Sequence, residues 1–314
     1  MKKICILGAG TYGSYLANGL TKKYPDVEVM LLEIGNNLIK SEEEIGFCSF
    51  NMNEEYMGAK KGRFFGYGGT SAKWGGQLLF YSNLDCLDDV RMDYIKETNI
   101  QYKTKVLARF FKKNPNITDE LVQDGIYTKT GIWLKFNQRN LFKYFQIERN
   151  KRIKIKSNSR VIRLIKTEES ISSVIIIRNG IEEELKADIF YLTCGALESV
   201  RLLSYSNLFN NVKSSGGLSD HISYRCLTVK SSKPFFCKKD FSYYFQNNSL
   251  ITKRLVGEID GHAFYIQPVF NENFTFFQFL KNLIFQQKFS IKKLIISCKQ
   301  FIHLFPFVYY YFLK

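Results

Sequence analysis

The sequence predicts an α/β protein, α+β overall, and three observations along the chain support this prediction. A short apolar run at residues 4–7 breaks into a glycine-rich turn, and a helix-compatible stretch follows at once. A β-branched run at residues 174–177 leads into Asn179-Gly180, which is a signal for a hairpin turn. A last apolar run at residues 187–193 ends in another glycine turn and enters a second helix-compatible stretch. Together they predict a Rossmann-like nucleotide-binding domain with a β-meander, plus a smaller antiparallel-sheet domain.

The turn after the first strand has the spacing G-x-G-x-x-G, formed by Gly8, Gly10 and Gly13. Such glycines permit a tight turn, close approach of the backbone to a pyrophosphate, and close packing of a helix on a strand. The N–H groups and the positive dipole end of the following helix would receive the phosphates. An ordinary glycine turn is the alternative, but the order of strand, helix and strand favours a dinucleotide site.

Glu33 follows a second apolar run at residues 27–32, about twenty residues beyond the last glycine of the motif. An acid at this place binds ribose hydroxyls, and it would repel the 2′-phosphate of NADP. Glu33 therefore suits FAD or NAD and disfavours NADP, but it does not separate FAD from NAD.

Periodicity divides the chain into a first domain at residues 1–222 and a second domain at residues 223–314. Within the first domain, residues 85–150 are expected to form a largely helical insertion, and strand periodicity begins at residue 151. The second domain is expected to be an incomplete substrate domain that ends in a helical, aromatic and basic tail. Its strand-like runs are residues 224–229, 241–245 and 262–267.

The net charge of +16 at first suggests a nucleic-acid partner. Its distribution argues against one, because the basic residues stand in short pairs such as Lys22-Lys23 and form no long basic arm. The sequence also has no helix-turn-helix, zinc-finger or RNA-binding signature. A solvated basic surface, which would attract anionic substrates or lipid, is the favoured interpretation.

Cysteine usage and the N-terminal residues predict a cytoplasmic protein. The seven cysteines include no C-x-x-C pair, and Cys5 and Cys194 lie in strand contexts, where cysteine behaves as a small hydrophobe. The chain begins directly in a strand without a signal peptide, and it has no apolar run long enough to span a bilayer.

Three segments, in this order, resemble the glucose–methanol–choline (GMC) family of FAD-dependent oxidoreductases. The first is the turn at residues 8–13 together with Glu33. The second, G-G-T-S-A-K-W-G-G at residues 68–76, is similar to the family's G-G-[ST]-S element in the Trp-Gly-Gly form of bacterial sugar and polyol dehydrogenases. The third, C-G-A-L-E-S-V-R-L-L at residues 194–203, is close to the family's A-G-A-L-E-S-P-R-L-L. A weaker fourth match, G-L-S-D-H at residues 217–221, is similar to G-x-x-L-x-D-H.

The resemblance implies FAD as the cofactor and a role for each matched residue. Gly8, Gly10 and Gly13 would hold the FAD pyrophosphate, and Glu33 would bind the adenosine ribose. The residues that would line the pyrophosphate and the isoalloxazine are Gly68, Gly69, Thr70, Ser71, Trp74 and Gly75.

Three further positions complete the implied cofactor site. The backbone of Val161 would meet the adenine, and Gly195 and Ala196 would approach the flavin side of the cofactor. The residues by themselves also favour FAD, because three separate glycine turns suit a long, extended dinucleotide better than a compact nicotinamide site. A flexible loop at residues 66–76 is the alternative interpretation of the second turn.

GMC enzymes oxidise an alcohol carbon by hydride transfer to the flavin, and a histidine near the C-terminus takes the hydroxyl proton. Nothing in this chain resembles the family's closing block that carries this histidine and its histidine or asparagine partner. His221 belongs to the fourth motif, and His262 and His303 are interpreted as packed or surface histidines. The sequence assigns no catalytic residue and no metal ligand.

Three functional hypotheses stay open. The leading one is an FAD-dependent oxidoreductase that acts on a CH–OH group of a sugar, polyol or other alcohol, with an unknown electron acceptor. The second is a truncated, catalytically inactive FAD-binding remnant, and the third is a peripheral membrane or partner-binding module on the same scaffold. Residues 274–314 bear on the third, because a basic, aromatic segment either lies on an anionic membrane surface or belongs to an exposed part of the substrate domain.

Overall fold

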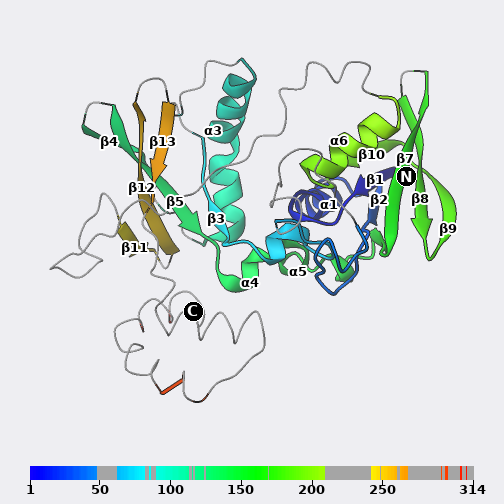
Figure 1. The fold of residues 1–314 in the computed structure, drawn as a ribbon, viewed down its shortest axis with the longest axis horizontal. Coiled ribbons are helices and arrows are strands. Elements are labelled where there is room, and N and C mark those ends of the chain that lie inside the picture. The colour runs from blue at the N-terminus through cyan, green and yellow to red at the C-terminus, as the bar shows by residue number, and fades with distance from the viewer. Residues whose placement is uncertain are drawn as a thin grey trace. The chain divides into compact units, whose positions relative to one another are not determined.

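The computed structural model divides the chain into two compact units (Figure 1). The first unit is Met1–Gly75 with Asn137–Tyr224, and the second is Gly76–Phe136 with Arg225–Lys314. Each unit is therefore built from two segments that are far apart in sequence. The structure describes residues 1–47, 62–81, 85, 90–112, 115, 117–123, 125–168, 170–208, 242–247, 249–259 and 262–267, and the single residues 291, 294, 295, 305 and 309.

A four-stranded parallel sheet forms the centre of the first unit. Its strands, in spatial order, are β10 (Ile189–Leu192), β1 (Lys2–Leu7), β2 (Val27–Leu32) and β6 (Ile153–Lys156). Helix α1 (Thr11–Lys23) connects β1 to β2. Ile4 of β1 lies beside Ile189 of β10 and Val29 of β2. The last apolar run, at residues 187–193, therefore supplies strand β10 beside β1, as a Rossmann-like domain requires.

Both faces of this parallel sheet are buried, because successive side chains of a strand point to opposite faces. One core contains Ile4, Ile6, Val29, Leu31, Phe142 and Ile147. The other contains Cys5, Leu7, Leu32, Leu164, Val174 and Ile176. Burial raises the pKa of the Cys5 thiol to about 12, which agrees with its predicted behaviour as a small hydrophobe.

The predicted β-meander is confirmed as a three-stranded antiparallel sheet of β7 (Ser159–Thr167), β8 (Ser170–Arg178) and β9 (Ile181–Lys186). Asn179 and Gly180 connect β8 to β9 with φ angles of 52° and 79°. Two consecutive positive φ angles are what a type I′ hairpin turn requires, and Asn-Gly adopts them readily. Helix α6 (Ala196–Tyr205) follows β10 and packs against β7.

Short helical elements surround the second glycine cluster. A 3₁₀ turn, η1 (Gly69–Ala72), lies within the cluster itself. Helix α5 (Leu141–Tyr144) and the 3₁₀ turn η2 (Ile147–Arg149) lie at the end of the range expected to be largely helical. The ring of Tyr67 stacks on that of Phe142, with centroids 4.3 Å apart. This contact holds the glycine cluster to α5.

An antiparallel sheet and helix α3 (Val90–Phe110) form the second unit. The sheet runs in the order β11 (Ser242–Gln246), β12 (Ser249–Ile259), β5 (Ile126–Trp133) and β3 (Gln77–Leu78). Strand β4 (Glu120–Gln123) also pairs with β5, and β13 (His262–Ile266) pairs with β12. The four-residue helix α4 (Phe136–Arg139) follows β5.

The structure differs from the helical insertion expected at residues 85–150. Helix α3 lies within this range, but β4 and β5 are strands, and β5 pairs with β12, with Lys129 beside Arg254. The pairing joins residues far apart in sequence, so local periodicity cannot reveal it. The strand expected at residues 224–229 lies outside the described residues, as does the tail from Phe274 except for five isolated positions.

The second unit has a charged pair in its interior and hydrophobic side chains on its surface. Lys129 of β5 pairs with Asp85, and their side chains are only 5% and 4% exposed.

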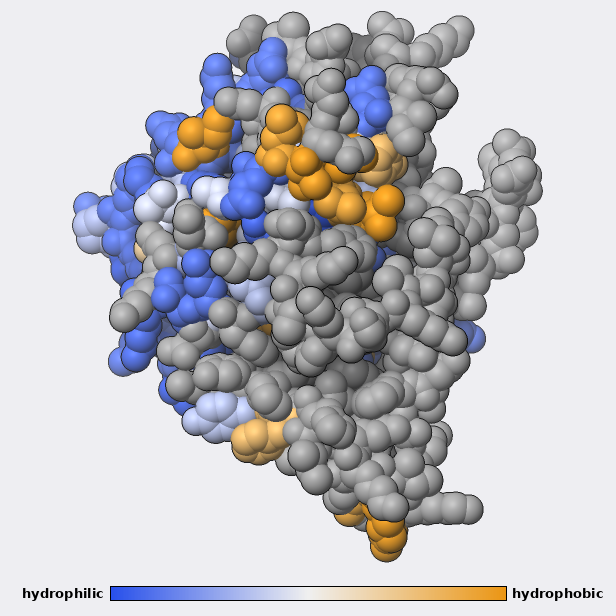
Figure 2. All heavy atoms as spheres, turned by 90° about the vertical axis from the view of Figure 1, so that its left-hand side faces the viewer, coloured by the Kyte–Doolittle hydropathy of each residue, from blue (hydrophilic) through white to orange (hydrophobic). Residues whose placement is uncertain are grey.

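Large exposed hydrophobic residues include Leu121 and Val122 on β4. Figure 2 shows hydrophobic residues gathered among hydrophilic ones on the face that it presents. Within the described ranges, no helix is long and apolar enough to cross a membrane.

Candidate functional site

The first glycine turn lies at the carboxyl end of β1 and opens helix α1. Gly8 has a φ of +106°, and a Cβ there would lie 2.9 Å from the Cα of Cys194. A Cβ on Gly13 would lie 1.9 Å from the carbonyl oxygen of Gly8. Both positions require glycine because the chain packs closely against itself there.

Gly10 differs from the other two glycines, because nothing lies within 4 Å of the position that its Cβ would take. Gly10 is the N-cap of α1, where no side chain caps the helix and the first turn contains no acidic residue. The first N–H groups of a helix have no partners within the helix, and the helix dipole makes this end attractive to anions. The open space beside Gly10 is therefore suited to a phosphate group.

Glu33 is buried at the carboxyl end of β2 and joins three backbone segments. Its Oε2 accepts a hydrogen bond from the N–H of Ala9 at 2.9 Å, and its Oε1 accepts from Gly35 at 3.0 Å and Gly66 at 2.9 Å. Burial raises the pKa of this carboxyl, and the three hydrogen bonds oppose that rise. The residue predicted at the ribose thus also ties the first glycine turn to the second. Its contact with a ribose stays a prediction.

The second glycine turn is held directly against the first. The N–H of Gly68 donates to the carbonyl oxygen of Ala9 at 2.9 Å. A Cβ on Gly69 would lie 3.1 Å from the Cα of Gly10. Both Gly68 and Gly69 have a positive φ, which favours glycine at these positions. Two turns that are separate in sequence therefore form one surface.

Ser71 and Asn140 brace this second turn. The Oγ of Ser71 donates to the carbonyl oxygen of Gly68 at 2.6 Å, and the Nδ2 of Asn140 donates to that of Tyr67 at 2.9 Å. Asn140 also caps helix α5, since its Oδ1 accepts from the N–H of Lys143 at 3.1 Å. The sequence does not indicate a role for Asn140 at the site, although an asparagine before a helix is a typical N-cap.

The other predicted residues of this element are more accessible. Thr70 and Gly75 are exposed, and Trp74 is half-buried. The Nε1 of Trp74 donates to the carbonyl oxygen of Arg139 at 3.1 Å, and the Nη1 of Arg139 donates to that of Trp74 at 3.3 Å. Burial lowers the pKa of Arg139 to about 10. The roles of Thr70, Trp74 and Gly75 toward a flavin stay predictions.

The third glycine turn reaches the first from the neighbouring strand β10. The Oγ1 of Thr193 lies 3.0 Å from the carbonyl oxygens of Leu7 and Gly8, to which it donates. Gly195 has a φ of +86°, serves as the N-cap of α6 without a side-chain cap, and has nothing within 4 Å of a Cβ position. Ala196, which is exposed, begins the helix. A second uncapped helix start therefore follows the strand next to β1.

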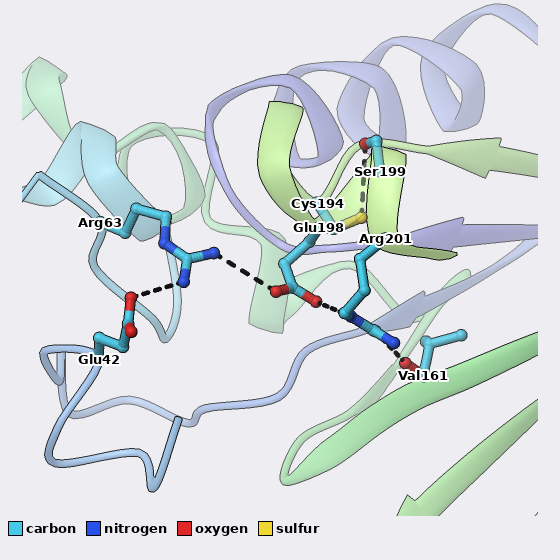
Figure 3. Close-up of polar contacts among 7 residues, drawn as sticks. All are labelled: Glu42, Arg63, Val161, Cys194, Glu198, Ser199 and Arg201. Atoms are coloured by element: carbon cyan, nitrogen blue, oxygen red, sulfur yellow. Dashed lines mark hydrogen bonds and ion pairs between the residues drawn. The ribbon is translucent and has the colours of Figure 1, made fainter. Parts of the chain in front are cut away.

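Val161 is connected to helix α6 by a chain of polar contacts (Figure 3). Its carbonyl oxygen accepts from the Nη2 of Arg201 at 2.9 Å, and the Nε of Arg201 pairs with Glu198 at 2.8 Å. Glu198 also pairs with Arg63 at 3.3 Å, and Arg63 pairs with Glu42 at 2.5 Å. Of these contacts, sequence alone indicates the one between Glu198 and Arg201, which are three residues apart on one helix.

The predicted nucleotide-binding residues thus include a connected group that fits an extended dinucleotide. Glu33 and Gly68 both bond to the backbone of Ala9, which lies between Gly8 and Gly10, and Gly69 packs against Gly10. The third turn joins them through Thr193, and Val161 joins that turn's helix through Arg201. The open, uncapped start of α1 is suited to phosphate groups, and the uncapped start of α6 follows the neighbouring strand.

No catalytic base is assigned in this site. His262 lies on β13 in the second unit, and His221 and His303 lie outside the described residues. In the part of the chain that the structure describes, no group of three or more His, Cys, Asp or Glu residues could hold a metal ion.

Comparison with known proteins gives no family model and no curated protein that matches the chain. Among solved structures, pyridoxine 4-oxidase from Mesorbium loti is similar with a TM-score of 0.44 and 19% identity, over 66% of this chain and 52% of that chain. A variant formate oxidase of Aspergillus oryzae RIB40, studied for its FAD modification, is similar with a TM-score of 0.43 and 13% identity, over 65% of this chain and 48% of that chain. This chain spans about half the length of these solved chains.

Proposed function

We propose that this chain is the nucleotide-binding part of an FAD-dependent oxidoreductase of the GMC type. The reaction is hydride transfer from a CH–OH group of a sugar, polyol or other alcohol to the flavin. The observation that supports the proposal most is the contact between two glycine turns, in which the N–H of Gly68 donates to the carbonyl oxygen of Ala9 at 2.9 Å. Several glycine turns in contact suit a long, extended dinucleotide better than a compact nicotinamide site, for which the first turn alone suffices.

The adenosine half is assigned from the geometry of Gly10 and Glu33. The open space at Gly10 and the start of α1 receive the pyrophosphate. An ionised carboxylate offers about four acceptor positions, and three backbone N–H groups occupy three of those on Glu33. Its Oε2, which accepts only from Ala9 among the described residues, accepts the remaining hydrogen bond from a ribose hydroxyl.

The flavin half is assigned to the second and third glycine turns. Trp74 and Gly75 line the isoalloxazine, and Gly195 with Ala196 approaches it from the start of α6. Bound FAD supplies the hydride acceptor, and the protein orients it. The choice of a sugar or polyol rests on the Trp-Gly-Gly form of the second motif, and the electron acceptor is unassigned.

Titration of the purified full chain with FAD tests the cofactor. We expect saturable binding and flavin absorbance bands that stay with the protein through gel filtration. FMN is the matched control, because it lacks the adenosine half that Gly10 and Glu33 bind. Absence of the bands after incubation with FAD contradicts the proposal, and equal affinity for FMN contradicts the dinucleotide assignment.

Anaerobic reduction separates the oxidoreductase from an inactive FAD-binding remnant. The flavin-loaded protein is mixed with a panel of sugars, polyols and simple alcohols, and bleaching of the flavin bands reports hydride transfer. Flavin that stays bound but that no compound bleaches supports the remnant instead. Co-sedimentation with anionic liposomes, with and without residues 274–314, tests the membrane-binding alternative.

A further inference from the structure

The carbonyl oxygen of Val161 is held where β7 leaves its regular pairing. The register between β7 and β8 shifts between Val161 and Arg163, which marks a β-bulge. Bulges redirect backbone groups and side chains. Two hydrogen bonds tie this stretch to α6 and its end, one from Arg201 to Val161 at 2.9 Å and one from the N–H of Leu164 to the Oγ of Ser206 at 2.8 Å. Helix α6 and its end therefore brace the bulged stretch, which also pairs with β8.

The Val161 carbonyl accepts a hydrogen bond from a guanidinium that is itself held. Arg201 donates through Nε to Glu198 and through Nη2 to Val161, so two edges of its planar group are engaged (Figure 3). Glu198 is 15% exposed and pairs with Arg63 as well. A planar fork fixes two hydrogen-bond directions at once, which a lysine ammonium does not do.

The start of β7 lies beside the proposed ribose site. The N–H of Ser159 donates to the carbonyl oxygen of Glu33 at 2.9 Å, and that of Asn158 donates to Gly35 at 3.0 Å. Val161 is two residues further along the strand, about 7 Å away. A base attached to a ribose at Glu33 therefore comes within reach of Val161. A carbonyl oxygen has two lone pairs, and Arg201 takes one of them.

We infer that Arg201 is a positioning residue for purine recognition in this chain. Held by Glu198, it directs the Val161 carbonyl so that its second lone pair accepts the exocyclic amine of adenine and rejects the keto oxygen of hypoxanthine. Arg201 acts through Val161 and not by touching the base. The inference rests on the proposed function, because it takes the nucleotide to lie along Gly10, Glu33 and Val161.

Calorimetric titration of the full chain with ADP and with IDP tests this inference without the flavin. We expect the wild type to bind ADP about tenfold more tightly than IDP, because IDP leaves the Val161 carbonyl facing another oxygen. Arg201→Met keeps much of the side-chain volume and removes the donors, and should bring the two affinities within about twofold. Arg201→Lys should not restore the ratio. Arg163→Met removes an exposed cation from the same strand. It is the matched control and should keep the wild-type ratio of the two affinities.

The ratio of the two affinities separates recognition from a merely structural role. If Arg201→Met weakens ADP and IDP by the same factor and keeps their ratio, the inference is overturned. Should Arg201→Met fail to fold, Glu198→Gln is the second variant, because it weakens the ion pair that holds Arg201. Glu198→Gln should also lower the preference for ADP over IDP, and an unchanged ratio overturns the inference. A wild type that binds FAD and ADP but does not discriminate against IDP also overturns it. A wild type that binds neither FAD nor ADP instead refutes the proposed function.

Discussion

The Oε1 of Glu33 lies 2.9 Å from the backbone nitrogen of Gly66, although 33 positions separate the two residues in the chain. The same oxygen accepts from Gly35, and the Oε2 accepts from Ala9. One buried carboxylate therefore fixes the first glycine turn, the end of β2 and the second glycine turn relative to one another. Removal of the Glu33 carboxylate should therefore disturb the positions of both glycine turns in the nucleotide site.

Replacing Glu33 with alanine leaves three buried N–H groups without this acceptor. We expect Glu33→Ala to lower the free energy of unfolding by about 3 kcal/mol, since a single buried unsatisfied donor costs roughly 1–3 kcal/mol. Urea unfolding followed by circular dichroism measures the change. Glu43→Ala, which removes an exposed acid nearby, is the control and should change stability by less than about 0.5 kcal/mol. Equal effects of the two substitutions would show that Glu33 does not hold the turns together.

The burial of Glu33 also predicts a pH dependence. Burial raises the folded-state pKa of this carboxyl above its ordinary value of 4.5, so the folded protein binds the proton more tightly than the unfolded chain. This contribution to stability is fully present below the ordinary value and is lost as the pH rises through the folded value. Relative to Glu33→Gln, the wild type should therefore lose stability as the pH rises above 4.5. Unfolding of both proteins at a series of pH values measures this, and parallel curves would contradict it.

Gly10 offers a test of the cofactor site that leaves the fold intact. Gly10 has a φ of −71°, and an added Cβ meets no atom within 4 Å, so Gly10→Ala should fold normally. The methyl group fills the space assigned to the pyrophosphate, and FAD affinity should fall by more than about tenfold. Gly19→Ala, in the same helix and equally open, is the matched control. It should keep FAD affinity and add up to about 1 kcal/mol of stability. Unchanged FAD affinity in Gly10→Ala would remove the pyrophosphate from this turn.

The buried pair of Lys129 and Asp85 should matter for the stability of the second unit. Asp85→Asn leaves the Lys129 ammonium buried beside a neutral amide, and we expect a loss of about 3 kcal/mol. Adding Lys129→Met should recover part of that loss, and a double-mutant cycle in urea measures the coupling. Glu28→Gln is the control. It breaks an ion pair in which Lys154 is 68% exposed, and it should cost much less stability than Asp85→Asn. A cost for Asp85→Asn no larger than this would contradict the burial of the pair.

Several elements of the first unit follow from sequence because their signals are local. The apolar run at residues 27–32 forms β2 with the same bounds, and Asn179-Gly180 forms the hairpin turn expected of it. In contrast, the sequence does not indicate that β5 and β12 pair in the second unit, because the local pattern of a strand does not identify the strand it pairs with. The bracing of the site by Asn140 and Thr193 is hidden for the same reason.

The amino-acid sequence by itself determined where the three glycine turns stand and which acid follows the second strand, since turn chemistry and apolar periodicity act over a few residues. The tertiary structure alone decided that Gly68 bonds to Ala9, that Glu33 serves three backbone donors, and that Arg201 holds the carbonyl of Val161. These contacts join segments that are far apart in the chain and that meet only in the folded protein. Residue spacing along the chain therefore cannot predict them.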